Sequence, residues 1–137
     1  MTRLRLLTCL AVLGGLTAAP VSSALGITSF RTPSKNIYCG FIGNQVRCDI
    51  FKTSAKGPPE PPSCQLDWGI AYGLTQRGRG RGLCVGDTVL NSRAKVLAYG
   101  TSIKRGRITC TSRTAGLTCA NKNGHGFFLS RQRIRVY

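Results

Sequence analysis

Hydrophobic and polar positions alternate most clearly in residues 36–50, and this pattern predicts a β-hairpin. The dipeptide Gly43-Asn44 in its middle suits the tight primed turns that join hairpin strands. A two-residue turn there places Cys39 opposite Cys48 in a non-hydrogen-bonded pair, where the short Cα–Cα distance suits a disulfide. The alternation then predicts a single core face, made of Ile37, Cys39, Phe41, Val46, Cys48 and Ile50.

Shorter alternating or apolar segments predict further strands, separated by turns rich in glycine, proline and asparagine. They lie at residues 25–32, 70–74, 83–85, 95–99, 108–110, 117–119 and 126–137. This close succession of strands and turns predicts an all-β fold. We expect a compact, disulfide-stabilised small sandwich or barrel of roughly six to eight short strands.

A second pair of cysteines repeats the spacing of the first. Symmetric pairing places Cys110 opposite Cys119, with Ile108 and Leu117 on the same face. The intervening Thr114-Ala115 does not favour a primed turn. A longer loop, which changes the type of pair that the cysteines occupy, is therefore the alternative.

Cys64 and Cys84 remain after the two hairpin pairs, and their pairing completes a framework of disulfides typical of a small exported domain. Metal binding is the competing interpretation of these cysteines. The C-x-x-C pairs of zinc ribbons are absent from the sequence, and His125 is its only histidine. The sequence therefore predicts disulfides and no metal site, and it implies no cofactor.

The first 24 residues have the organisation of a cleaved signal peptide. Arg3 and Arg5 form a basic start, residues 6–16 are an apolar run, and a small-residue stretch ends at Ser22-Ser23-Ala24. The apolar run is shorter than the roughly 20 residues that a membrane-spanning helix needs; a retained signal anchor is the alternative. We expect residues 1–24 to be removed and residues 25–137 to form one domain. That domain has no integral membrane segment and is secreted, periplasmic or on the cell surface.

The chain is strongly basic, with a net charge of +16 at pH 7 and only four acidic residues. Two basic clusters, Arg77–Gly82 and Lys104–Arg107, coincide with predicted turns, for which a solvated connection is the alternative explanation. The predicted last strand carries three arginines on one face, where like charges repel and favour an anionic partner. The candidate binding residues are Arg77, Arg79, Arg81, Lys104, Arg105, Arg107, Arg131, Arg133 and Arg135.

The leading functional hypothesis is a non-enzymatic exported binding module. Its basic surface is expected to contact an anionic envelope polymer, an anionic lipid surface or an acidic protein. This choice follows from the charge and from the scarcity of catalytic groups.

A small secreted hydrolase of the nuclease type is the first rival. His125 lies between two glycines and, beside arginines, suits acid–base catalysis of phosphodiester cleavage. Asp49, Glu60, Asp67 and Asp87 are the only carboxylates, and Glu60 lies in the proline loop. A cleft that joins His125 to Asp67 or Asp87 would favour the hydrolase. A tight turn explains the flanking glycines equally well.

A proline-rich segment supports the second rival, a secreted inhibitor or effector. Residues 57–62 read Gly-Pro-Pro-Glu-Pro-Pro, which neither holds a helix nor pairs in a sheet. A plain connection is the simplest interpretation, and presentation of this loop to a partner is the alternative. Trp68, just beyond it, is expected to pack in or over the core.

An ordered set of motifs covers nearly all of the chain after the predicted leader. It comprises Phe30–Cys39, Val46-Arg47-Cys48, Cys64-x-x-Asp67-Trp68-Gly69, Cys84-x-Gly86-Asp87-Thr88, Tyr99-Gly100, Cys110, Cys119 and Gly124-His125-Gly126-Phe127. In these motifs the chain resembles a family of small exported bacterial proteins with a domain of unknown function. The resemblance implies an exported, cysteine-paired domain without an established activity or catalytic residues. Lys35 stands where the resemblance implies glycine, and the arginine excess is unusual, so the basic surface is expected to belong to this protein alone.

Overall fold

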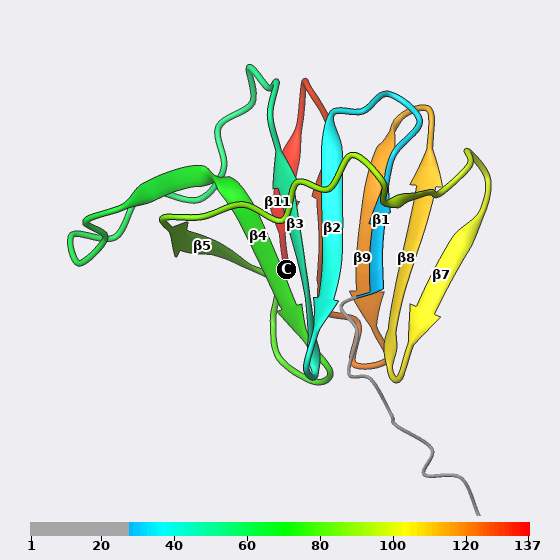
Figure 1. Cartoon of the computed structure of the whole chain (residues 1–137). Helices are drawn as coiled ribbons and strands as arrows, with labels where there is room; N and C mark the ends of the chain where they lie inside the picture. Colours follow the sequence, from blue (N-terminus) through cyan, green and yellow to red (C-terminus); the bar gives the residue numbers. More distant parts are fainter. Residues whose placement is uncertain (1–27) are drawn as a thin grey trace, which may run out of the picture.

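The computed structural model describes residues 28–137, which form two β-sheets packed face to face (Figure 1). The predicted leader lies outside the described residues. The first sheet has the strand order β5 (Arg81–Val85), β4 (Asp67–Thr75), β3 (Gln45–Ile50), β2 (Ile37–Ile42), β1 (Thr28–Arg31) and β6 (Lys95–Val96). The second has the order β11 (Ile134–Val136), β10 (Gly126–Leu129), β9 (Gly116–Asn121), β8 (Ile108–Arg113) and β7 (Ser102–Arg105).

The predicted all-β class is confirmed, and of the two expected architectures the structure forms the sandwich. The described residues contain eleven strands and no helix. This number exceeds the expected one because short stretches such as Ser102–Arg105 pair at the edges of the sheets. Buried rings join the two layers: the centroids of Tyr72 on β4 and Phe127 on β10 lie 6.4 Å apart.

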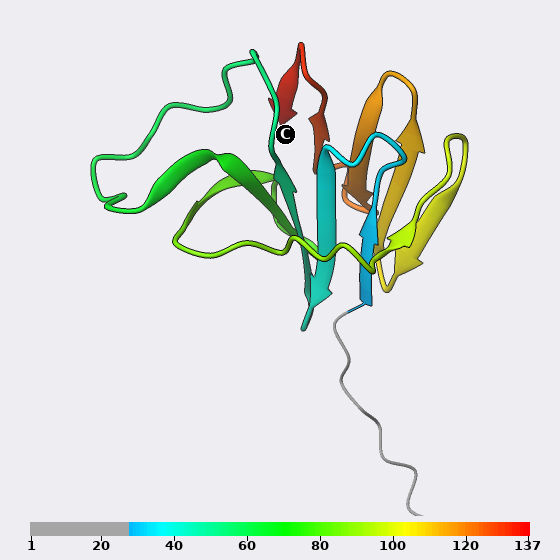
Figure 2. The same cartoon turned by 45° about the horizontal axis from the view of Figure 1, so that its top comes forward.

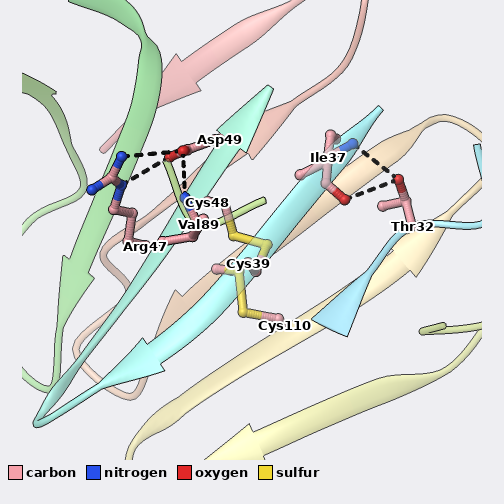
Figure 3. Close-up of a disulfide and its surroundings, with 9 residues drawn as sticks. Thr32, Ile37, Cys39, Arg47, Cys48, Asp49, Val89 and Cys110 are labelled. Atoms are coloured by element: carbon pink, nitrogen blue, oxygen red, sulfur yellow. Dashed lines mark hydrogen bonds and ion pairs between the residues drawn. A yellow bond between two sulfur atoms is a disulfide. The ribbon is translucent and has the colours of Figure 1, made fainter. Parts of the chain in front are cut away.

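The opening hairpin has the predicted register. Ile42 pairs with Gln45 beside the turn, and Cys39 pairs with Cys48, with Cα atoms 4.1 Å apart. That distance is typical of a non-hydrogen-bonded antiparallel pair. All six residues predicted for its core face belong to the buried cluster between the sheets. The disulfide, drawn in Figure 3, joins two cysteines that are completely buried.

The second hairpin also closes symmetrically, with Cys110 opposite Cys119 and Cα atoms 4.0 Å apart. Its turn has two residues, Thr114-Ala115, so the longer loop considered as the alternative does not form. Neither residue has a positive φ, and Gly116 instead adopts a φ of +153° directly after the turn. Glycine tolerates that conformation far better than other residues, which explains a tight turn without a primed-turn dipeptide.

A crossing segment, residues 86–94, runs from β5 at one edge of the first sheet to β6 at the other (Figures 1 and 2). It covers the outer face of this sheet, and β6 then pairs parallel to β1. The predicted strand at residues 95–99 is limited to Lys95–Val96. The third predicted disulfide, Cys64–Cys84, is also present and ties the proline-rich loop to β5.

Candidate functional site

Arg47 lies on the outer face of β3 and is held by carboxylates from two distant parts of the chain. Its Nε and Nη2 atoms donate to the oxygens of Asp49 at 2.9 and 3.1 Å (Figure 3), and Nη1 donates to Asp87 Oδ1 at 2.7 Å. The Thr88 hydroxyl and the Val89 amide donate to Asp49 Oδ2, both at 3.0 Å. This network fastens the crossing segment to the sheet.

The same contacts shift two pKa values. Burial lowers the pKa of Arg47, but the hydrogen bonds to Asp49 and Asp87 outweigh burial and raise this pKa above its ordinary value. The Arg47 guanidinium in turn lowers the pKa of Asp87 through its hydrogen bond. Among residues 28–137, Arg47 is the only basic residue that forms a salt bridge. The exposed arginines and lysines therefore carry charge that no carboxylate of the described chain offsets.

Three loops bring two predicted basic clusters together at one end of the sandwich, the lower end in Figures 1 and 2. They are the β4–β5 loop, the β7–β8 turn and the β9–β10 turn. Arg107 Nη2 donates to Asn123 Oδ1 at 2.5 Å, and Asn123 Nδ2 donates to the Arg77 carbonyl at 3.2 Å. Gln76 Oε1 accepts a hydrogen bond from the Arg107 amide at 2.6 Å. Segments 16 to 46 positions apart in the sequence thus form one connected surface.

Further basic residues surround this connection. Arg79 and Lys122 are exposed in the same loops, and Lys104 is exposed near the end of β7. Arg105 is half-buried, and its Nη1 atom donates to the Phe41 carbonyl at 3.3 Å. Arg81 begins β5 directly after the β4–β5 loop. We define the basic end by Arg77, Arg79, Lys104, Arg105, Arg107, Lys122 and His125.

The glycines between these arginines are required by packing. A Cβ atom on Gly80 would collide with the carbonyl of Gly126, and one on Gly82 would lie 2.8 Å from the Trp68 ring. Side chains of an extended segment point alternately to its two sides. Gly80 and Gly82 therefore face the packed part of the protein, while Arg79 and Arg81 are exposed. The glycine–arginine alternation is therefore a packing pattern that leaves its charges in solvent.

The three C-terminal arginines do not form the predicted row on one strand. Ser130 and Arg133 close a turn in which the Ser130 amide donates to the Arg133 carbonyl at 2.9 Å. Arg131 and Arg133 therefore lie in the β10–β11 turn, and only Arg135 lies on β11. This turn contacts Ser54 beyond β3, at the end opposite to the basic end. Arg131 and Arg133 are therefore separated from the loops of the basic end. Arg135 lies between the two ends, because the next residue but one, Tyr137, accepts hydrogen bonds from the Gly80 and Gly126 amides.

Aromatic rings engage two of these C-terminal arginines. The guanidinium carbon of Arg133 lies 4.7 Å from the centroid of the Phe128 ring, and that of Arg135 lies 5.6 Å from the Tyr137 ring. Such cation–π contacts hold the side chains against the outer face of the second sheet.

His125 belongs to the β9–β10 turn of the basic end, where Asn121 Oδ1 accepts a hydrogen bond from its amide at 3.2 Å. Asn121 also donates to the carbonyl of Thr75 at the end of β4, whereas Asp67 begins that strand. Eight residues of strand span about 26 Å. Asp87 is engaged by Arg47 on the outer face of the first sheet. The carboxylate partner that the hydrolase hypothesis requires is therefore not assembled beside His125 in the described chain.

The proline-rich loop is fixed by Trp68. The indole Nε1 atom donates to the Pro58 carbonyl at 2.9 Å, and the ring covers Gly82 on β5. Gly57 approaches the Tyr72 hydroxyl group so closely that a Cβ atom there would collide with it. Trp68 thus packs over the sheet and binds the loop to it, in line with a structural connection.

Sequence reasoning missed Lys122 of the basic end and two uncharged residues that connect its loops. Gln76 and Asn123 carry no charge, yet their side-chain hydrogen bonds link the loops. Lys122 stands in a recognisable Asn-Lys-Asn-Gly turn, and its charge was the available signal. The sheet topology decides which turns lie at the same end of the sandwich. The role of these residues is therefore visible only in the folded protein.

A family profile matches residues 8–137, which is nearly the entire chain. The protein belongs to the DUF6636 family. This is a family of unknown function, so membership assigns no activity to the protein. No curated protein and no solved structure matches the chain significantly.

The disulfides and the lengths of the elements bear on the environment of the protein. The three disulfides are typical of proteins in an oxidising, extracellular environment. Within residues 28–137 there is no helix long and apolar enough to cross a membrane.

Proposed function

We propose that this DUF6636 protein is exported and binds an anionic polymer, non-enzymatically, through its basic end. The observation that carries the proposal is the convergence of Arg77, Arg107 and Lys122 from three loops, without a carboxylate among the residues that define this surface. Such a concentration of unpaired charge raises the self-repulsion of the fold. An anionic chain that bridges the loops removes this repulsion and releases its own counterions.

The geometry favours a polymer over a small anion. The basic groups extend from the β4–β5 loop across the β9–β10 turn to the end of β7, which makes an extended surface rather than an enclosed pocket. Their side chains are mostly exposed, so each contact is individually weak and screened by salt. Many charges along one ligand are needed for affinity, and a polyphosphate or an acidic envelope polymer supplies them.

The test is binding to long-chain inorganic polyphosphate at several salt concentrations, with fluorescence anisotropy as the readout. Replacing Arg77, Arg79 and Lys122 by Gln removes three exposed charges that make no side-chain hydrogen bond or salt bridge within the described residues. The slope of log K against log salt should then become shallower by about two to three units.

The matched control replaces Arg113, Arg131 and Arg133 by Gln, which removes the same charge from the opposite end of the sandwich. Its slope should change by less than about one unit. Equal weakening in both triple variants would mean that net charge alone drives binding and would refute the site. Binding to anionic lipid vesicles without binding to polyphosphate would refute the polymer as the ligand class.

A further inference from the structure

The end opposite to the basic end contains a hollow of about 170 Å³ between the two sheets. Its floor is apolar and includes the buried Ile37 and Leu129. Its walls come from the β1–β2, β8–β9 and β10–β11 turns, which meet at the upper end in Figures 1 and 2. The polar groups that concern a ligand are those of Ser34, Tyr99, Arg113, Thr114, Arg131 and Gln132.

The walls are held in place by other polar side chains. The Asn36 amide exchanges two hydrogen bonds with the backbone of Lys52, at 2.9 and 2.7 Å. The Ser130 hydroxyl donates to the Arg133 carbonyl at 3.1 Å and accepts from the Arg133 amide at 2.9 Å. The Thr32 hydroxyl accepts a hydrogen bond from the Ile37 amide at 3.3 Å. The hollow is therefore preformed, which lowers the cost of ordering on binding.

The groups that line this preformed hollow are rich in unused hydrogen-bond donors. Within residues 28–137, the guanidinium groups of Arg113 and Arg131 take part in no salt bridge. The residues that line the hollow include no carboxylate. Two like charges at one small hollow repel each other, and an anion between them reverses the sign of that interaction. A carboxylate also matches the planar donor fork of arginine.

The size and the apolar floor define the ligand further. An engineered apolar cavity of about 150 Å³ holds one benzene ring, so this hollow accommodates one six-membered ring. Tyr99, a residue that is 44 % exposed, adds an aromatic face. The hydroxyl and amide groups offer partners for sugar hydroxyls. We propose that the hollow binds one hexuronate unit, with its carboxylate at Arg113 and Arg131.

A second hollow of about 320 Å³ shares Arg131 and Gln132 with the first. It is also lined by Lys52 and by two hydroxyl side chains, Thr53 and Ser54. The β10–β11 turn thus stands between two adjoining hollows. An acidic saccharide longer than one unit can continue from the first hollow into the second.

The experiment is a titration of the isotope-labelled protein followed by amide chemical shifts in NMR. Glucuronate should shift the resonances of residues 34, 99, 113–116, 131 and 132, whereas neutral glucose should shift them at least about tenfold less at equal concentration. Replacing Arg113 or Arg131 by Gln should weaken glucuronate binding by about tenfold or more. Replacing Arg77 and Arg79 by Gln, at the basic end, should leave it unchanged.

Three outcomes would overturn the hexuronate site. Shifts spread over basic residues throughout the protein would show unspecific charge attraction. Equal affinity for inorganic phosphate and glucuronate would remove the role of the sugar ring. Unchanged binding in both single variants, with their spectra otherwise native, would remove the role of the arginines. The polyphosphate test at the basic end uses different residues, so the two proposals fail or succeed separately.

Discussion

At the scale of single residues, Arg47 shows how one buried cation organises a distant segment. Asp49 lies two positions away on the same strand, and Asp87 comes from the crossing segment. A buried ion pair of this kind often adds little net stability over apolar packing, but removing one partner is costly. We interpret the network as a device that sets the position of residues 86–94 on the sheet. The motif residues Asp87 and Thr88 thereby acquire a structural role.

The lowered pKa of Asp87 predicts a specific pH dependence of stability. Because the folded protein holds this carboxyl in its charged form, its contribution is complete above the pKa of the unfolded chain, about 3.9. The contribution disappears as the pH falls through the lower pKa of the folded state. Replacing Asp87 by Asn should therefore reduce the fall in the urea midpoint between about pH 5 and pH 2. Replacing the exposed Asp67 by Asn is the control and should leave that fall close to the wild-type value.

Lys35 predicts a stabilising substitution. It has a φ of +57° and is the only residue other than glycine with a positive φ in residues 28–137. This left-handed conformation costs an L-amino acid roughly 1–2 kcal/mol. Glycine avoids that cost, but its greater conformational entropy in the unfolded chain offsets part of the gain. Lys35→Gly should therefore raise the free energy of unfolding by about 0.5–1 kcal/mol in urea titrations. Ser34→Gly, next to it and without a positive φ, should lower the free energy instead; a gain in both variants would contradict the explanation.

At the scale of elements, local periodicity predicted the two hairpins well and the last strand poorly. The hairpin register depends on a turn and on alternation within fifteen residues, so it is encoded locally. The alternation of Arg131 to Val136 looks like one strand as well. Ser130 instead forms hydrogen bonds to the Arg133 backbone through its hydroxyl and its amide. Residues 130–133 are therefore a turn, and only the residues after them continue as a strand. Serine favours such local bonds over strand pairing.

The positions of the disulfides predict the order of their reduction. Cys39, Cys48, Cys110 and Cys119 are completely buried, whereas Cys64 is partly exposed and Cys84 is exposed. Thiol exchange requires access to a sulfur atom, so the Cys64–Cys84 disulfide should open first in native protein. Stepwise reduction with dithiothreitol, followed by alkylation and peptide mass spectrometry, measures this order. Early labelling of either hairpin pair would show that a hairpin opens more readily than the loop.

At the scale of the whole molecule, charge is distributed over both ends rather than over one face. The basic end gathers loops from both sheets, while Arg113, Arg131 and Arg133 lie at the opposite end. The outer face of the first sheet holds the only salt bridges in residues 28–137. Most of the basic residues therefore gather at two ends of different shape.

This distribution predicts that salt stabilises the fold. Among residues 28–137 the basic side chains greatly outnumber the acidic ones, and most of them are exposed. Raising the ionic strength from 0.01 to 1 M shortens the screening length from about 30 to about 3 Å and weakens this repulsion. The thermal midpoint should rise by several degrees, corresponding to about 1 kcal/mol. The variant with Gln at positions 113, 131 and 133 should gain less, and a midpoint that falls with salt would refute the repulsion.

The sequence by itself determined the all-β class, the two hairpin disulfides and the register of the first hairpin, because turns and period-two alternation act over short distances. The pairing of Cys64 with Cys84 followed by elimination. Only the tertiary structure decided which charges meet. Arg77 joins Asn123 across 46 positions, and Arg47 joins Asp87 across 40. Such contacts depend on strand order and on the path of the crossing segment, which alternation along the chain does not specify. The basic end and the hollow near Arg131 are consequently products of topology.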